Sequence, residues 1–146
     1  MSATAVLCWV LAVSDGDTLK VRCADHASAA PVQVRIVGID APERRQAFGV
    51  QSRTQLQTLC LRRRTQLQIE GVDKYQRTLA QVQCQGQDVA AQQVRAGLAW
   101  VYLPTREEFP ELQNLEHEAR GERRGLWSQR RPLPPWEYRR RYAKQR

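Results

Sequence analysis

The spacing of apolar positions along the chain predicts an α+β fold. Short apolar runs rich in β-branched residues, several of them alternating with polar positions, lie between turn-forming residues. They cover residues 5–14, 18–24, 32–39, 65–70 and 78–84. We therefore predict five strands.

Three longer segments have the spacing of amphipathic helices. They lie within residues 44–64, 88–100 and 105–127. Asp88 is the predicted N-cap of the second helix, and Thr105 with Glu108 forms a predicted capping box for the third. Five strands with three helices indicate a five-stranded β-barrel like that of the oligonucleotide-binding fold, with the helices packed around it.

Charge divides the chain into a neutral body and a basic end. The formal net charge is +8, and residues 120–146 contain ten Lys and Arg against two Glu, which accounts for all of it. Residues 129–146 are interrupted by prolines and are predicted to be extended. We expect one domain over residues 1–128 and a basic Pro/Arg-rich tail over 129–146, with a polyanion as partner.

Four cysteines, Cys8, Cys23, Cys60 and Cys84, lack the C-x-x-C spacing of a zinc cluster. Four cysteines allow three full pairings, and the sequence does not choose among them. Cys8 lies in the most apolar strand, where we expect a buried thiol; one disulfide among the other three would suit an exported protein.

No segment predicts contact with a membrane. The longest apolar run, TAVLCWVLAV, is shorter than the roughly 18 residues that a spanning helix needs. The same run lacks a basic leader and a small-residue cleavage site, so we expect no intact signal peptide in this chain.

Two carboxylates are predicted to meet at one mouth of the barrel. A hairpin centred at residues 28–29 pairs positions whose numbers sum to 57, which places Asp17 opposite Asp40. Their mutual repulsion is unfavourable without a cation, and oxygen ligands suit Ca²⁺ or Mg²⁺. The turn after Asp40 offers the carbonyl of Ala41 as a further ligand.

Three more charged residues extend this site. Glu43 follows Asp40 by three positions, Arg35 lies on the preceding strand, and Arg77 lies at the entrance of the strand over 78–84. Cleavage of a phosphodiester needs a positioned water, a base, and cations that stabilise the charge growing on the phosphate. The pattern therefore predicts a metal-dependent phosphodiesterase.

The segments VSDGDTLKV, VRIVGIDAPE, DKYQRT, VRAGLAWVY and EARGERRGLW resemble the staphylococcal nuclease family in order and spacing, over residues 5–128. The resemblance implies a five-stranded barrel with three helices and calcium-dependent hydrolysis of DNA and RNA. It also implies that Asp17, Asp40 and the Ala41 carbonyl bind Ca²⁺, with Asp15 outside the ligand shell. A secreted or periplasmic location would agree with the family.

The resemblance also implies catalytic roles. Glu43 would orient or deprotonate the attacking water, and Arg35 and Arg77 would bind the phosphate. The 5′ oxygen would leave, and a 3′-phosphate would remain. Gln76 stands where the family usually has Gly, so a turn that needs positive φ would be reshaped or strained before Arg77.

Substrate contacts are expected beyond the reacting groups. Tyr75 could stack on a base, and Arg139, Arg140 and Arg141 could contact phosphates from the tail. No segment resembles a base-reading helix, so we expect action on DNA or RNA with little sequence preference. We also expect the protein to be a monomer. Two other classes stay open: a binding module of the same fold that does not cut, and a protein-interaction domain that uses its basic tail.

Overall fold

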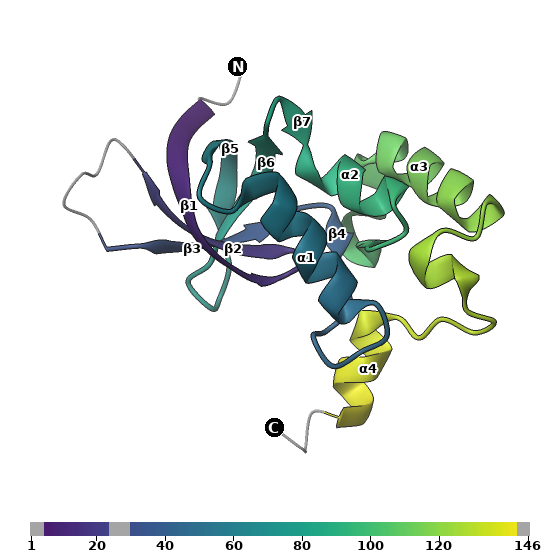
Figure 1. Ribbon diagram of the computed structural model, residues 1–146. Helices are drawn as coiled ribbons and strands as arrows, with labels where there is room; N and C mark the ends of the chain where they lie inside the picture. Colours follow the sequence, from purple (N-terminus) through teal and green to yellow (C-terminus); the bar gives the residue numbers. More distant parts are fainter. Residues whose placement is uncertain (1–4, 24–29, 143–146) are drawn as a thin grey trace.

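The barrel is closed by five strands. A computed structural model of the chain describes residues 5–23 and 30–142. The main sheet has the strand order β3-β2-β1-β5-β6-β7, and an additional parallel pairing of β3 with β6 closes it (Figure 1). Its strands are β1 (Ala5–Asp15), β2 (Thr18–Cys23), β3 (Val32–Ile36), β5 (Arg64–Val72), β6 (Thr78–Cys84) and the short β7 (Gln87–Asp88). The predicted α+β barrel is confirmed.

Three helices pack around the barrel: α1 (Gly49–Cys60), α2 (Val89–Arg95) and α3 (Pro110–Gly121). Asp88 caps α2 as predicted, because its side chain accepts a hydrogen bond from the Ala91 amide at 3.0 Å. Figure 1 shows α2 and α3 together at one end of the barrel, with α1 lying across it.

The predicted start of the third helix was wrong. A 3-10 helix, η2 (Leu103–Glu108), comes first, and α3 begins only at Pro110. Proline suits the first position of a helix, because its φ is already helical and its missing N–H would be unpaired there. The Thr105 hydroxyl has no hydrogen-bond partner within the described residues, so the capping box does not form.

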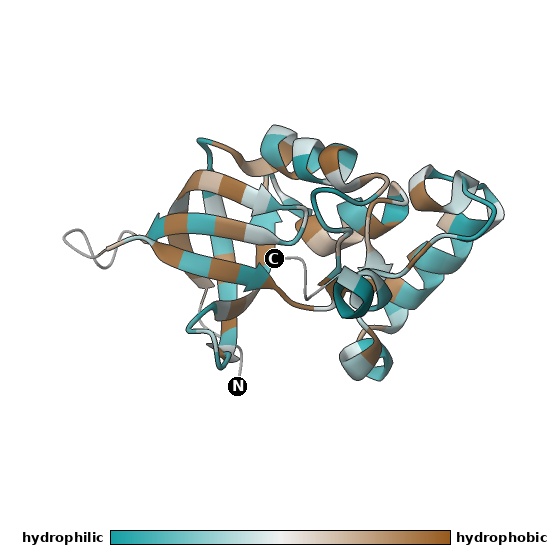
Figure 2. Cartoon of the chain, turned by 90° about the horizontal axis from the view of Figure 1, so that it is seen from below, coloured by the Kyte–Doolittle hydropathy of each residue, from teal (hydrophilic) through white to brown (hydrophobic). Residues whose placement is uncertain are grey.

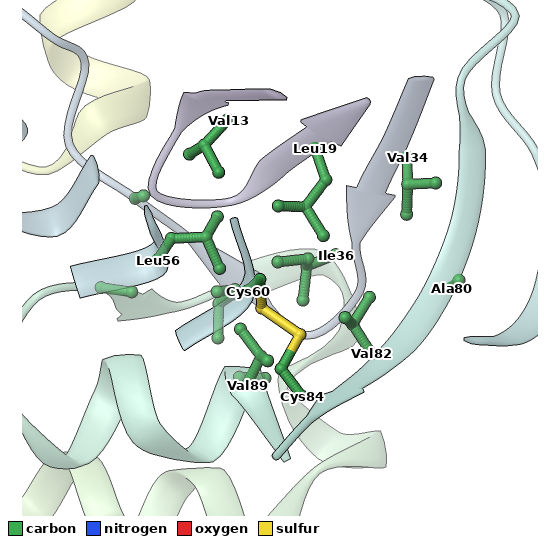
Figure 3. Close-up of a cluster of buried hydrophobic side chains, with 14 of the residues drawn as sticks. Val13, Leu19, Val34, Ile36, Leu56, Cys60, Ala80, Val82, Cys84 and Val89 are labelled. Carbon is green, nitrogen blue, oxygen red and sulfur yellow. A yellow bond between two sulfur atoms is a disulfide. The ribbon is translucent and has the colours of Figure 1, made fainter. Parts of the chain in front are cut away.

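The core fills the barrel and the space beneath α1 and α2. On β2 apolar and polar residues alternate, as the hydropathy colouring of the strands shows (Figure 2), and its Leu19 and Val21 point inward. β1 is apolar almost throughout and buries Cys8, Val10 and Val13. Leu19, Ile36 and Leu56 are fully buried, and the disulfide Cys60–Cys84 joins α1 to β6 in the middle of this cluster (Figure 3).

The second disulfide, Cys8–Cys23, corrects the expectation of a free thiol at Cys8. The apolar pattern around Cys8 shows that the residue is buried, and it is 4% exposed. It does not show that Cys23 lies directly opposite on β2, which is a matter of strand register. No free cysteine occurs in the described chain.

The tail is helical where it was predicted to be extended. After η3 (Gly125–Ser128), residues 129–134 lead into α4 (Pro135–Tyr142), which Figure 1 shows beside the loop before α1. The Trp136 ring packs 5.3 Å from the Trp100 ring, and the Gln46 side chain donates to the Leu133 carbonyl at 2.6 Å. Pro132 and Pro134 precede the helix and Pro135 is its first residue, so no proline interrupts it. The domain boundary at residue 128 stays a prediction.

No helix in the described residues is long and apolar enough to cross a bilayer.

Candidate active site

An open cleft of about 1200 Å³ lies where the barrel end, the β5–β6 turn and α4 meet. The charged residues predicted to form the site line it: Asp15, Asp17, Arg35, Asp40, Glu43 and Arg77, with Ala41. Tyr75 and Arg139 also line it. The structure therefore brings the predicted residues into one cavity, although they come from five separate segments.

Asp17 and Asp40 converge on the guanidinium of Arg35. Its Nη2 lies 3.5 Å from Asp17 Oδ2 and 3.6 Å from Asp40 Oδ1. Arg35 is itself held by a hydrogen bond from Nη1 to the Ile36 carbonyl at 2.6 Å. The two aspartates are 7% and 0% exposed, so their charges interact through a poorly solvated region.

The predicted hairpin register behind this pair was wrong. Thr18 pairs with Arg35, a sum of 53, and the Ile36 amide donates to the Asp17 carbonyl at 2.9 Å. The predicted hairpin centre at residues 28–29 lies outside the described residues. Asp40 reaches Asp17 by another route: the chain turns at Gly38, with φ +87°, and forms β4 (Ile39–Asp40) against β8 (Trp100–Val101).

A buried polar network fixes the turn that carries Asp17. Gln93 on α2 donates to the Gly16 carbonyl at 2.8 Å and to the Ser52 carbonyl at 3.0 Å, and Ser52 donates to the Leu98 carbonyl at 2.7 Å. A Cβ at Gly16 would lie 1.8 Å from Ser52 Oγ, so only glycine fits there. Two helices thus hold the β1–β2 turn in place.

The Asp17 carboxylate is held by its neighbours. The Ala41 amide donates to Oδ2 at 2.8 Å and the Thr18 hydroxyl donates to Oδ1 at 2.9 Å. A cation here would find oxygen donors, namely the two aspartates, a backbone carbonyl and water, and this donor set fits a hard divalent ion. Within the described ranges, no group of three or more His, Cys, Asp or Glu is arranged to hold a metal ion.

Arg139 of α4 enters the site and pairs with its carboxylates, whereas the sequence predicted only a phosphate contact for this residue. Its Nη2 lies 2.8 Å from Asp40 Oδ2, and its Nη1 lies 3.2 Å from Asp40 Oδ1 and 3.3 Å from Glu43 Oε1. Burial disfavours the charged guanidinium, but these hydrogen bonds outweigh burial and raise the pKa of Arg139. The phosphate contact predicted for Arg139 stays a prediction.

Two carboxyl groups respond to this crowding. Burial, reinforced by the charge of Asp17, raises the pKa of Asp40, while Arg139 and Arg35 oppose the rise. Burial also raises the pKa of Asp15, and the charges of Asp17 and Glu43 add to it. Asp15 therefore lies close enough to the site to feel its charges.

The turn over residues 73–77 presents Tyr75 and Arg77. Asp73 accepts from the amides of Tyr75 and Arg77 at 2.8 and 2.9 Å and from Arg77 Nε at 2.8 Å. These hydrogen bonds outweigh the effect of burial and lower the pKa of Asp73. Tyr75 is 66% exposed, with Lys74 and Arg77 within 5.4 Å of its ring centroid. Sequence reasoning missed Asp73, whose spacing to Tyr75 is that of an Asx-turn.

The outer part of α4 has two further residues at the cleft. Tyr138 and Tyr142 line it, with ring centroids 4.6 Å apart. Arg140 and Arg141 are exposed, and Arg140 pairs with Glu137. The interleaving of tyrosine and arginine in the tail sequence was the signal that could have identified this surface.

The comparisons with known proteins agree with this geometry. A sequence model of the family described as "Staphylococcal nuclease homologue" matches residues 33–129. The chain is 40% identical over 141 residues to Protein ParB of Escherichia coli, covering 90% of this chain and 77% of that protein. It is 37% identical over 144 residues to a micrococcal nuclease of Shigella flexneri, covering 90% and 79%.

A third relative, an endonuclease of Haemophilus influenzae described as uncharacterised, is 38% identical over 133 residues, with 91% of this chain and 72% of that protein covered. The chain belongs to the staphylococcal nuclease family. The individual roles assigned above to Asp15, Asp17, Arg35, Asp40, Ala41, Glu43, Tyr75 and Arg77 stay predictions.

Proposed function

We propose that this protein is a divalent-cation-dependent nuclease that hydrolyses phosphodiester bonds of DNA and RNA. The observation that supports it is the convergence of Asp17, Asp40, Glu43 and Arg35 in one cleft. Relatives named as a micrococcal nuclease and as an endonuclease agree with this chemistry.

Asp17, Asp40 and the Ala41 carbonyl would hold the cation, and we propose Ca²⁺. When bound, such an ion would neutralise the phosphate and stabilise charge on its oxygens. Asp15 would orient water around it. Oxygen donors alone do not separate Ca²⁺ from Mg²⁺, but Ca²⁺ accepts the more irregular geometry of a site built from two aspartates and a backbone carbonyl.

Glu43 would accept the proton of the attacking water as the new oxygen–phosphorus bond forms. Arg35 and Arg77 would donate hydrogen bonds to the phosphate as its charge increases. The bond from phosphorus to the 5′ oxygen would break, this oxygen would take up a proton, and the product would end in a 3′-phosphate. Arg77 would first have to share its guanidinium between Asp73 and the phosphate, because its Nε is held by Asp73.

Unpaired bases suit the rest of the cleft. Tyr75 and the Tyr138–Tyr142 pair line the cleft and offer aromatic surfaces on which bases can stack. Arg139, Arg140 and Arg141 would contact phosphates from the tail, with residues 129–146 acting as a basic extension of the domain over 1–128. A single-stranded substrate and a monomeric enzyme agree with this arrangement.

The test is digestion of single-stranded DNA and RNA with added Ca²⁺, Mg²⁺ or chelator. We expect cleavage that the chelator abolishes and that Glu43→Gln slows by about 10² or more, the usual effect of a positioned base. Glu118→Gln, an exposed glutamate on α3 that pairs with Arg124, is the matched control and should cleave like the wild type.

Circular dichroism confirms that both variants are folded. Cleavage that persists in the chelator would contradict the cation requirement. Near wild-type turnover of a folded Glu43→Gln variant would remove Glu43 from the mechanism. Binding without any cleavage would favour the binding module of the same fold.

A further inference from the structure

A row of exposed cationic and aromatic side chains crosses the outside of the barrel, away from the cleft. Trp9 on β1 pairs directly with Arg22 on β2 and with Arg64 on β5. Cys8 and Val10, its chain neighbours, are buried, so Trp9 points outward and is 45% exposed. Arg22 and Arg64 are exposed as well.

The described part of this surface is cationic. Within residues 5–23 and 30–142, none of Lys20, Arg22 and Arg64 forms an ion pair, although ion pairs are frequent elsewhere in the structure. Directly opposed side chains on neighbouring strands lie about 5 Å apart at Cβ. The Trp9 indole therefore lies between two guanidinium groups, one from each neighbouring strand.

The same surface continues toward the cleft. Lys20 lies two residues before Arg22 on β2 and pairs with Gln33 on β3. Gln33 lines the cleft, and both residues are exposed. A chain leaving the cleft over Gln33 would therefore meet Lys20 first and then Arg22, Trp9 and Arg64.

We propose that Lys20, Arg22, Trp9 and Arg64, here called the Trp9 face, bind the flanking part of a single-stranded nucleic acid whose reacting phosphate lies in the cleft. This inference rests on the proposed function. The cations contact phosphates, which accounts for the polyanion, and the exposed indole stacks on a base, which requires an unpaired strand.

The separation of the two sites sets the length of the ligand. Trp9 and Asp15 are six residues apart on β1, or about 20 Å at 3.3 Å per residue. A four-nucleotide strand centred on the cleft does not extend this far on either side. Strands that fill an oligonucleotide-binding barrel occupy about 4–16 nucleotides, so a 20-nucleotide strand reaches both sites.

The test measures the binding of fluorescein-labelled oligothymidylates of 4 and 20 nucleotides by anisotropy, in chelator, so that no cleavage occurs. The variants are Arg22→Gln with Arg64→Gln, and Trp9→Ala. Arg95→Gln with Arg123→Gln, which removes the same charge from exposed positions outside the cleft, the Trp9 face and the tail, is the matched control.

We expect the Arg22/Arg64 variant to bind the 20-nucleotide strand about 10-fold more weakly and to flatten its log–log salt dependence by roughly 1.4, since each phosphate contact contributes about 0.7. Trp9→Ala should weaken binding of the same strand without changing the slope. Binding of the 4-nucleotide strand should be unchanged in both. Trp9→Phe, which keeps a ring that can stack on a base, should restore most of the affinity.

If the log–log salt dependence of the Arg22/Arg64 variant has the same slope as that of the control variant, the proposal is overturned. So would a wild-type dimer, seen by sedimentation, that Trp9→Ala converts to monomer, because the exposed Leu7 and Trp9 would then form a subunit interface. Failure of the proposed function has a different signature. The chain would then bind the long strand through the Trp9 face but cut nothing when Ca²⁺ is added.

Discussion

Gln76 adopts a backbone conformation that side chains other than glycine disfavour. Its φ is +67°, in the turn that presents Arg77, and the amide of Gln76 donates to the Asp73 carbonyl at 3.1 Å. The left-handed region costs a residue with a Cβ about 1–2 kcal/mol. The turn before Arg77 therefore has positive φ at Gln76, and it is strained. Asp73 offsets this strain, because its carboxylate accepts hydrogen bonds from the amides of Tyr75 and Arg77.

Replacing Gln76 with glycine should stabilise the protein. The relief of strain is partly offset by about 0.5–1 kcal/mol, because glycine gives the unfolded chain more freedom. We expect a net gain below about 1 kcal/mol, or a rise in Tm of about 2 °C in a domain of this size. Gln76→Ala retains the strain and should not raise the Tm. A calorimetric scan that gives equal Tm values for the two variants would contradict this account.

Residue types alone predicted the composition of the cleft but not its contacts. Asp17, Asp40 and Glu43 could be predicted because acidic side chains beside buried strands are unusual and demand a partner. The register between β2 and β3 could not be predicted, because no tight-turn sequence marks the centre of their hairpin. In the structure Thr18 pairs with Arg35. The partnership of Asp40 with Arg139 spans 99 residues, and no local pattern reports it.

At the scale of elements, α4 sets the chain apart from a plain barrel with three helices. Its anchor is aromatic: Trp136 packs against Trp100, which in turn packs against Trp127 at 4.6 Å between ring centroids. Periodicity did not reveal α4, because it has eight residues and follows a run of prolines. Its position depends on tertiary contacts, as expected for a helix too short to be stable alone.

Arg139 and a divalent cation would contact the same oxygens, because the guanidinium binds both Oδ1 and Oδ2 of Asp40. Arg139→Gln should therefore raise the affinity for Ca²⁺ by about 10-fold, equivalent to about 1.4 kcal/mol. Arg140→Gln removes the same charge from the exposed side of α4 and should leave the affinity nearly unchanged. Calorimetric titration of Ca²⁺ into both variants and the wild type measures this.

Arg139→Lys keeps the charge but loses the bidentate geometry, so its affinity should lie between those of the wild type and Arg139→Gln. In the wild type, Ca²⁺ should speed hydrogen exchange in α4 as Arg139 leaves Asp40. A variant with Gln at 139 that binds Ca²⁺ no more tightly than the wild type would show that the two partners coexist.

At the scale of the whole molecule, the two disulfides connect the parts of the barrel that hold the site. Cys8–Cys23 joins β1 to β2, the strands on either side of the Asp17 turn, and Cys60–Cys84 joins α1 to β6. The sequence separations are 15 and 24 residues. Loops of this size correspond to about 3 kcal/mol of stabilisation each, through the unfolded state.

Removing the Cys60–Cys84 bridge should lower the free energy of unfolding by about 3 kcal/mol, and the Tm by roughly 10 °C. Cys60→Ala with Cys84→Ala is the variant of choice, since both positions are buried and alanine adds no polar group. Urea denaturation compares it with the wild type under oxidising conditions. Adding reductant should destabilise the variant further by opening Cys8–Cys23. Equal midpoints for variant and wild type would mean that the bridge does not form in solution.

The contact between Arg139 and Asp40 also implies that the cation and the nucleic acid favour each other's binding. A cation that displaces Arg139 releases a guanidinium at the edge of the cleft, where a phosphate can accept its hydrogen bonds. Because coupling between two ligands is reciprocal, the nucleic acid must then tighten cation binding by the same factor. Arg139 would thus leave the Asp40 carboxylate and bind a phosphate of the substrate. At low cation concentration, the substrate itself would raise the fraction of protein that has a cation bound.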